Sequence, residues 1–302
     1  MTAFDKTALP KKVRLSGADC FHLVLDKHAK KHGAGGNVMR KIFYFSKPIS
    51  FNKIEGILKS SPVIYWLCNI ELVPGSLLRI PYWKYSDKNR HIIINEAHVS
   101  IENEIPSGIL NRDISIDSNR FIEADLVCYP SGACAFILSW NHILLDAKGT
   151  TLLFDHLNQL TENKQTGFDN FFPLKEKRPD VARYIRNMYK VKAFIQKSSR
   201  APVSSIAAKK CRSSEGITRY KSIHFSSSET GKINSNAFKT GSRFGPTLFF
   251  IACCSQVIYK HNRQHNKQGD IWLPVPYDGR LKGGVGPLIS NCVSFLFYRL
   301  RE

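Results

Sequence analysis

Apolar residues recur at strand spacing in three short stretches of the first half of the chain. Residues 38–45 are rich in aromatic and β-branched side chains, and so are residues 121–128 and 133–140. The last two stretches are separated by Tyr129-Pro-Ser-Gly132, which is a turn sequence. The pattern predicts a strand at 38–45 and a hairpin at 121–140. The second hairpin strand is almost wholly apolar, which is typical of a strand covered on both faces.

Apolar residues at helical spacing predict a second set of elements. Helices are expected over 16–31, 51–60 and 150–160 in the first half, and over 228–240 and 245–261 in the second. Short β-rich runs predict further strands at 91–94, 98–101, 223–226, 270–276 and 289–300. Helices and strands occur together in both halves, which indicates a mixed α/β (α+β) fold.

The length of the chain indicates more than one domain. At 302 residues it is long for one typical domain and sufficient for two. Residues 201–216 are rich in Ser, Ala and Lys, as inter-domain linkers are. We therefore predict a first half over 1–170, a basic helix and linker over 171–215, and a second half over 216–302.

Three features bear on the cellular setting. No apolar run approaches the roughly 20 residues that cross a bilayer, and no apolar stretch follows the charged residues 1–12, as it would in a secretory signal. The eight cysteines lie mostly in apolar stretches and form no C-x-x-C pair. We therefore expect reduced, buried thiols and no metal site. These features favour a cytoplasmic protein, with peripheral attachment to a membrane as an alternative.

The chain is strongly basic, with a net charge of +20 from 44 Lys and Arg against 24 Asp and Glu. Much of the charge falls within 173–212, where residues 178–198 predict a basic helix with an apolar stripe of Val181, Ile185, Met188 and Ile195. Such a segment attracts an acidic carrier protein, an anionic membrane or phosphorylated ligands. A solvated linker and helix face is an equal alternative. No nucleic-acid-binding motif accompanies the charge, so nucleic acid is not an expected partner.

The most informative residues for chemistry follow the apolar hairpin strand. His142 and Asp146 stand between this strand and the next predicted helix. A neutral imidazole, with an ordinary pKa of about 6.5, can take a proton from a hydroxyl or amine at neutral pH. Asp146 can pair with an arginine and fix the loop. Taken alone, the pattern also fits a buried structural histidine followed by an aspartate that caps the helix.

The segment Asn141-His142-Ile-Leu-Leu-Asp146-Ala147 resembles a known family signature. It is similar to the H-H-x-x-x-D-G motif of the superfamily that includes chloramphenicol acetyltransferase, nonribosomal-peptide condensation domains and the wax ester synthase/diacylglycerol acyltransferases. The resemblance continues in order and spacing over nearly the whole chain. It is carried by Asp19-Cys-Phe-His-Leu-Val-Leu25 with Gly35-Gly-Asn-Val-Met39, Pro81-Tyr-Trp83, His98-Val99, residues 225–240 and 247–259, Pro274-Val-Pro-Tyr-Asp-Gly-Arg280, Val285-Gly286 and Asn291.

This resemblance implies a two-domain, chloramphenicol-acetyltransferase-like sandwich with a substrate tunnel between its halves. The implied reaction transfers an acyl group from a coenzyme A or carrier-protein thioester to a hydroxyl or amine, without a bound cofactor, a metal or a covalent intermediate. His142 is the implied catalytic base and Asp146 its structural partner, paired with Arg280. Ser290 and Asn291 fall on a strand that lines the tunnel in relatives, where they donate either to the oxyanion or to a neighbouring strand.

The chain departs from the family pattern at three places. Asn141 replaces the first histidine, as in relatives with a single histidine. Ala147 replaces a glycine whose backbone conformations alanine cannot adopt, so we expect a shifted turn, with Gly149 in compensation. The sequence stops at Glu302, where the family continues with a D-F-G-W-type motif, so we expect a curtailed second half. Ala147 and this early stop leave open an alternative, a non-catalytic binding or assembly protein with the same fold.

Overall fold

The computed structural model describes residues 4–31, 36–76, 80–118, 120–162, 220–221, 223–241, 245–280 and 289–300, with isolated residues between 186 and 206. The chain divides into two compact units. The first unit comprises Met1–Lys175, Ser213–Arg219 and Asp278–Ser294, and the second comprises Glu176–Arg212, Tyr220–Tyr277 and Phe295–Glu302. Residues 278–294 thus group with the first unit, although the sequence analysis places them in the second half. The limits 1–170, 171–215 and 216–302 stay a prediction.

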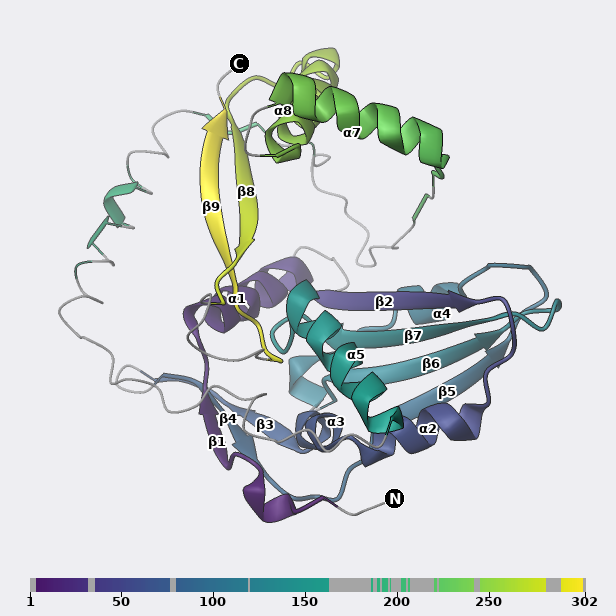
Figure 1. Cartoon of the computed structure of the whole chain (residues 1–302). Helices are drawn as coiled ribbons and strands as arrows, with labels where there is room; N and C mark the ends of the chain where they lie inside the picture. The colour runs from purple at the N-terminus through teal and green to yellow at the C-terminus, as the bar shows by residue number, and fades with distance from the viewer. Residues whose placement is uncertain are drawn as a thin grey trace. The chain divides into compact units, whose positions relative to one another are not determined.

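The main sheet of the first unit has four strands in the order β2-β7-β6-β5 (Figure 1). The strand β7 is antiparallel to both of its neighbours, whereas β5 is parallel to β6. All eight residues of β7 are buried, which confirms the prediction of a central strand covered on both faces. The strands are β2 (Val38–Phe45), β5 (Ile93–His98), β6 (Ile122–Cys128) and β7 (Cys134–Asn141).

Alternating side chains of the sheet enter two apolar cores. Phe136 and Leu138 of β7 belong to the larger core, which the helices α2 (Phe51–Ser60) and α5 (Ala147–Thr161) also line. Ala135 and Ile137 face the opposite side and belong to a smaller core that includes the short helix α4 (Ser107–Leu110). In Figure 1, α2 and α5 lie over one face of the sheet. The period of two along the strand therefore builds both layers from one sequence.

A second, three-stranded sheet of the first unit has the order β1-β4-β3, with both pairs antiparallel. The fully buried helix α3 comes directly before β3 in the chain, and Ser61 caps this helix by accepting from the backbone N–H of Ile64. The remaining helix of the first unit, α1 (Gly17–Lys31), carries the buried polar residues His22 and Asp26. The bounds not yet given are β1 (Lys12–Arg14), α3 (Pro62–Cys68), β3 (Ile70–Val73), β4 (Tyr82–Tyr85) and the 3-10 turns η1 (Lys6–Ala8) and η2 (Ile116–Ser118).

Besides isolated helical residues between 186 and 196, the structure describes two helices and a strand pair in and next to the second unit. These are α7 (Ser227–Gly241), α8 (Thr247–Gln264), β8 (Ile271–Asp278) and β9 (Val293–Leu300), with β8 and β9 paired. Ser226 and Glu229 form a capping box at the start of α7: the Glu229 carboxylate accepts from Ser226 N and the Ser226 hydroxyl accepts from Glu229 N. Within the described ranges, no helix combines the length and hydropathy required to span a membrane.

Most of the predicted elements are confirmed, several to within a residue or two, and the fold is mixed α/β as predicted. Three strand predictions are wrong. Residues 91–94 and 98–101 do not form two strands around a turn, because β5 runs continuously through the polar pair Asn95-Glu96, and Asn95 bonds Asp125 of β6. Residues 223–226 form no strand, because Ser226 begins the capping box of α7.

Two further expectations have a different outcome. The cysteines are free thiols in the described part of the chain, as predicted, but Cys253 and Cys254 on α8 are exposed rather than buried. Most of the predicted basic helix 178–198, with Val181, Ile185 and Met188, lies outside the described residues. The same is true of Gly35, Ile195 and Val285-Gly286.

Candidate active site

The loop after β7 is held in place by its backbone. The amide of Asn141 donates to the carbonyl of Phe121, and the amide of His142 donates to the carbonyl of Asn37 over 2.8 Å. The indole N–H of Trp140 donates to the carbonyl of Leu145, which is fully buried. Hydrogen bonds therefore hold the end of β7 and the loop that carries His142 in one arrangement.

The carboxylate of this loop, Asp146, accepts hydrogen bonds from several directions. It is the N-cap of α5 and accepts from the Gly149 amide over 2.6 Å. The Arg280 guanidinium donates to both of its oxygens over 3.0 Å, and the Cys292 amide donates to Oδ2 over 2.7 Å. The predicted ion pair of Asp146 with Arg280 is thus present, and the predicted alternative of a helix cap holds as well. Both side chains are less than one-tenth exposed.

Arg280 also donates to groups outside the loop. It donates to Asp278 Oδ1 over 2.9 Å and to the carbonyl of Ser290 over 2.8 Å. Burial disfavours its charge, but the hydrogen bonds to Asp146 and Asp278 outweigh that cost and the pKa of Arg280 is raised. The guanidinium therefore stays charged and ties the residues around 280 and 290 to the loop.

Ala147, which stands in place of the expected glycine, fits its backbone without strain. It is the first helical residue of α5, and it has no positive φ. The shift of the turn relative to the family stays a prediction. Gly149 matters for a different reason than backbone freedom. A Cβ at this position would overlap the carbonyl oxygen of Ser290 and lie 3.0 Å from Nη2 of Arg280. Only glycine admits the close approach of Ser290 and Arg280 to the start of α5.

The ring of His142 is partly buried and lies flat against another imidazole. Its centroid is 4.0 Å from that of His22, and the two planes differ by 26°. The Nδ1 atom is buried and has no hydrogen-bond partner of normal geometry among the described residues. Burial lowers the pKa of His142, and the carbonyls of His142 and Leu145 and the charge of Asp146 only partly offset this shift. The imidazole is therefore neutral at neutral pH, as a proton acceptor must be.

Helix α1 presents three polar side chains at helical spacing, Asp19, His22 and Asp26. His22 is 2% exposed, and its Nδ1 lies 3.0 Å from Nδ2 of Asn37. Burial, and then the neighbouring His142, lower the pKa of His22 to about 4. Asp26 accepts from the Asn37 amide over 2.8 Å. The sequence analysis did not single out His22 or Asp26, although the 19/22/26 spacing on one helix face was a usable signal.

Asp19 is the third member of this face. It forms a capping box with Ser16, whose amide donates to Oδ2 of Asp19 over 2.7 Å while the Asp19 amide donates to the Ser16 hydroxyl. Burial raises the pKa of Asp19 to about 7. The hydrogen bonds from Ser16 oppose this shift, and the negative charge of Asp146 adds to it. Asp19 is thus a second titratable group beside the loop of residues 142–146, which we call the HxxxD loop.

The asparagine that replaces the first histidine of the motif has a structural role. Asn141 is fully buried, and its Nδ2 donates to the carbonyl of Ile114 over 3.0 Å and to Oδ1 of Asp26 over 3.3 Å. Its Oδ1 accepts from the amide of Ile143. Asn141 therefore joins the end of β7 to α1 and is unsuited to proton transfer.

Ser290 and Asn291 lie next to the loop, and both side chains are engaged. The Asn291 Nδ2 donates to the carbonyl of His142 over 3.0 Å, and its Oδ1 accepts from the Val293 amide. The Ser290 hydroxyl lies 3.2 Å from the sulfur of Cys292. These contacts are of the structural kind that the sequence analysis set against an oxyanion role, and that role stays a prediction.

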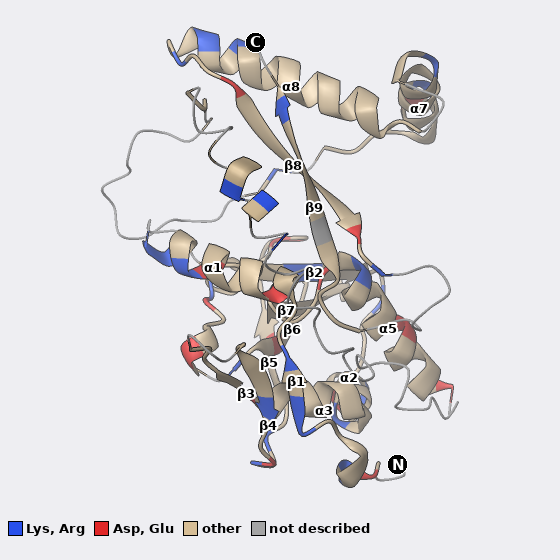
Figure 2. Ribbon diagram, turned by 90° about the vertical axis from the view of Figure 1, so that its left-hand side faces the viewer, with Lys and Arg blue, Asp and Glu red and all other residues tan. Residues whose placement is uncertain are grey.

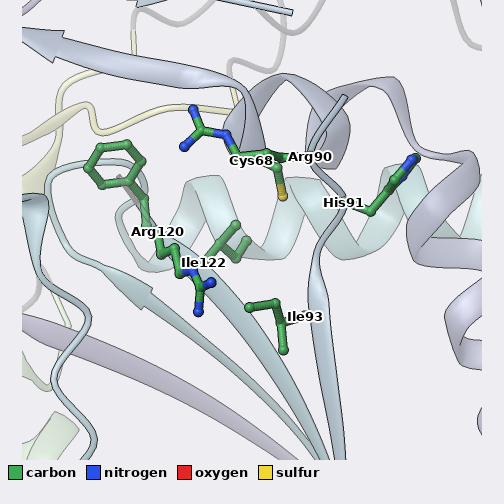
Figure 3. Close-up of a pocket in the computed structure, with 7 residues that line it drawn as sticks. Cys68, Arg90, His91, Ile93, Arg120 and Ile122 are labelled. Atoms are coloured by element: carbon green, nitrogen blue, oxygen red, sulfur yellow. The ribbon is translucent and has the colours of Figure 1, made fainter. Parts of the chain in front are cut away.

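Two hollows of the first unit do not include His142 in their lining. One of about 170 Å³ is shown in Figure 3 and is lined by Cys68, Arg90, His91, Ile93, Arg120, Phe121 and Ile122. The other, of about 370 Å³, is an apolar groove beside α2 and α5 that includes Ile54, Phe136 and Phe154. Neither contains a residue of the HxxxD loop. The chemistry of the loop therefore does not coincide with these hollows.

Neither a protein-family model nor a curated protein matches this sequence. Solved structures do match. The first condensation domain of the calcium-dependent antibiotic synthetase, in complex with a substrate analogue, superposes with a TM-score of 0.62 at 14% identity, over 96% of this chain and 70% of that one. The chain has the condensation-domain fold.

Two further structures with this fold are similar over most of the chain. One is the starter condensation domain of rhizomide synthetase RzmA, solved in complex with C8-CoA as a mutant in which an arginine is changed to alanine. It matches with a TM-score of 0.60 at 11% identity, over 97% of this chain and 67% of that one. The condensation domain of the Monacolin K polyketide synthase MokA matches with a TM-score of 0.57 at 11% identity, over 96% and 68%. These comparisons confirm the fold that the resemblance implied.

Proposed function

We propose that this chain is an acyltransferase that moves an acyl group from a thioester to a hydroxyl or amine, with His142 as the general base. The observation that carries the proposal is the place of the His142 imidazole, which follows the buried strand β7, stacks on His22 and lies in a loop whose aspartate pairs with Arg280. Burial lowers the pKa of His142, which favours the neutral imidazole. The condensation-domain fold supports the same assignment.

The proposed step needs one proton acceptor. His142 takes the proton of the acceptor O–H or N–H as that atom forms a bond to the thioester carbonyl carbon. The C–S bond then breaks, and the imidazolium returns the proton to the departing thiolate. Asp146 does not take part in proton transfer, because Arg280, Gly149 and Cys292 occupy its oxygens. Its role is to position the loop.

His22 is the second residue with a role in this proposal. Its ring stacks on that of His142, and its low pKa keeps it uncharged at neutral pH. A neutral partner holds the plane of the His142 ring without placing a positive charge beside it. We therefore assign His22 as a positioning residue rather than a catalytic one.

Coenzyme A is the donor to test first. A protein with this fold is solved in complex with C8-CoA. The chain carries +20 charge, and Figure 2 shows basic residues at the C-terminal end of α1 and along β1 and β4, which would attract phosphates. An acyl carrier protein, whose surface is acidic, is the alternative donor that the same charge would attract.

The test is release of free thiol from acyl-coenzyme A and from an acyl carrier protein, each with a panel of alcohols and amines. Wild-type protein should release thiol with at least one donor and acceptor pair. Binding of a donor by the folded protein without release of thiol for any pair would instead identify it as a non-catalytic binding protein. The sequence argument for that alternative from Ala147 is weakened, because Ala147 fits the start of α5 without strain.

A further inference from the structure

A group of three potential metal ligands lies on the neighbouring strands β5 and β6 of the first unit (Figure 1). Glu96 and His98 are two residues apart on β5 and so project from the same face of the sheet. Cys128 of β6 is the register partner of His98. The pairing of the two strands therefore brings a carboxylate, an imidazole and a thiol together from positions some thirty residues apart.

The distances within this group suit a tetrahedral ion. Oε1 of Glu96 lies 3.6 Å from the sulfur of Cys128 and 3.7 Å from Nε2 of His98, and all three ligand atoms lie within 4.8 Å of one another. Zinc bonds are about 2.3 Å to sulfur and about 2.0 Å to nitrogen and oxygen, which at tetrahedral angles separates neighbouring ligand atoms by roughly 3.3–3.6 Å. Small side-chain rotations would complete the contact.

The kind of ligand selects the kind of ion. A thiolate and an imidazole favour zinc or another late transition metal over magnesium or calcium, which prefer all-oxygen sites. Glu96 and His98 are exposed and Cys128 is half-buried, so an ion can reach the group from solvent. We propose that Glu96, His98 and Cys128 bind a zinc ion, with the thiol proton released to solvent and a fourth position left for water.

This site is separate from the proposed acyl-transfer residues. Cys128 pairs with Cys134 at the first residue of β7, whereas His142 follows the last residue of that strand. Seven steps of strand separate the two ends, or roughly 23 Å at 3.3 Å per residue. A metal at β5 and β6 is therefore too far away to touch a substrate at His142. We expect it to brace the edge of the sheet.

The sequence analysis expected no metal site because it searched for closely spaced cysteines. Here the ligands come from two parallel strands, and their proximity depends on a register that spacing alone does not give. The misassignment of residues 91–101 as two strands around a turn also hid the common face of Glu96 and His98.

The test is metal binding by the purified 302-residue chain after removal of bound metal with a chelator. Zinc affinity is measured by competition with a chromophoric chelator, and cobalt is used to detect a thiolate-to-metal absorption band. Wild-type protein should bind one equivalent of zinc. The substitutions Cys128→Ser and His98→Ala should each lower the affinity for this zinc at least tenfold. His98 is exposed, so its variant is expected to fold normally even if the cysteine variant does not.

Other thiols and histidines could bind zinc adventitiously, so matched controls are needed. The exposed pair on α8 is changed in the double variant Cys253→Ser/Cys254→Ser. His261 of α8 is changed to alanine, because its ring lies 4.3 Å from that of His265, the residue that caps the helix. Both controls should keep the equivalent of metal that Cys128→Ser loses. If wild type and His98→Ala bind zinc with equal stoichiometry and affinity, the proposed site is overturned.

Discussion

Replacing Asp146 with alanine removes the residue that ties the HxxxD loop to the 280–292 segment. The change deletes the cap of α5, both hydrogen bonds from Arg280 and the one from the Cys292 amide. It also leaves the buried guanidinium of Arg280 without the carboxylate that neutralises it. Breaking a buried ion pair by removing one member costs about 3–5 kcal/mol of the free energy of unfolding, and loss of a cap alone costs about 1 kcal/mol.

The structure places the expected cost at the lower end of that range. Arg280 keeps Asp278 at 2.9 Å and the carbonyl of Ser290 at 2.8 Å, so its charge is only partly stranded. We expect Asp146→Ala to lose about 3 kcal/mol, because the cap and the ion pair share one carboxylate and their losses do not add. For a unit of this size the loss corresponds to a fall in Tm of about 6–12 °C.

Urea and thermal unfolding followed by circular dichroism measure this loss, and Asp278→Ala is the matched control. Asp278 bonds the same Nη1 atom, but its side chain is 45% exposed, so its removal should cost at most about 1 kcal/mol. Asp146→Asn, which keeps an oxygen for the cap but not the charge, should fall between the two. Equal destabilisation by Asp146→Ala and Asp278→Ala would refute the assignment of Asp146 as the anchor of the loop.

Three further predictions concern Gly149, His22 and His156. Gly149→Ala should cost about 1–3 kcal/mol in urea unfolding, since its Cβ would overlap the Ser290 carbonyl; Gly108→Ala, whose Cβ meets nothing within 4 Å, should cost nothing, and equal effects would contradict the close-approach argument. His22→Ala should lower kcat about tenfold or more with KM little changed, and His22→Phe should recover most of it by restoring a stacked ring; no recovery would argue against stacking as the means of positioning. Burial lowers the pKa of His156 to about 4, so between pH 6.5 and 4 the unfolded chain binds a proton that the folded chain does not. The free energy of unfolding therefore falls by up to about 3 kcal/mol as the pH drops through that window. His156→Gln should flatten this part of the pH–stability curve, and an unchanged slope would contradict the argument.

The sequence predicted elements with strong local signals and missed those that depend on tertiary contacts. β2, α1 and the β6–β7 hairpin follow directly from apolar periodicity and a turn sequence. The helix α3 was not predicted, because its apolar run is only seven residues long and shows no helical periodicity. All seven residues are buried, which explains why they are apolar on every side. The short strands β3 and β4 were missed because their pairing is what defines them.

The candidate site divides in the same way. His142, Asp146 and Arg280 were predicted because the segments that carry them resemble a known family, and the structure brings the last two into contact. His22 was missed because its part depends on α1 lying against the loop, which no local pattern reveals. The importance of Gly149 was expected, but its cause is the close approach of Ser290 rather than a turn conformation.

The most direct test of the central claim is the acyl-transfer turnover of His142→Ala beside wild type, with the donor and acceptor pair that the thiol-release panel identifies. General-base catalysis contributes about 10²- to 10⁴-fold, so the account predicts a loss of turnover in that range. Donor binding and Tm should change little, because the loop is held by its backbone, by Asp146 and by Asn291 rather than by the His142 ring. Turnover by His142→Ala within a factor of about ten of wild type would contradict the assignment of His142 as the base.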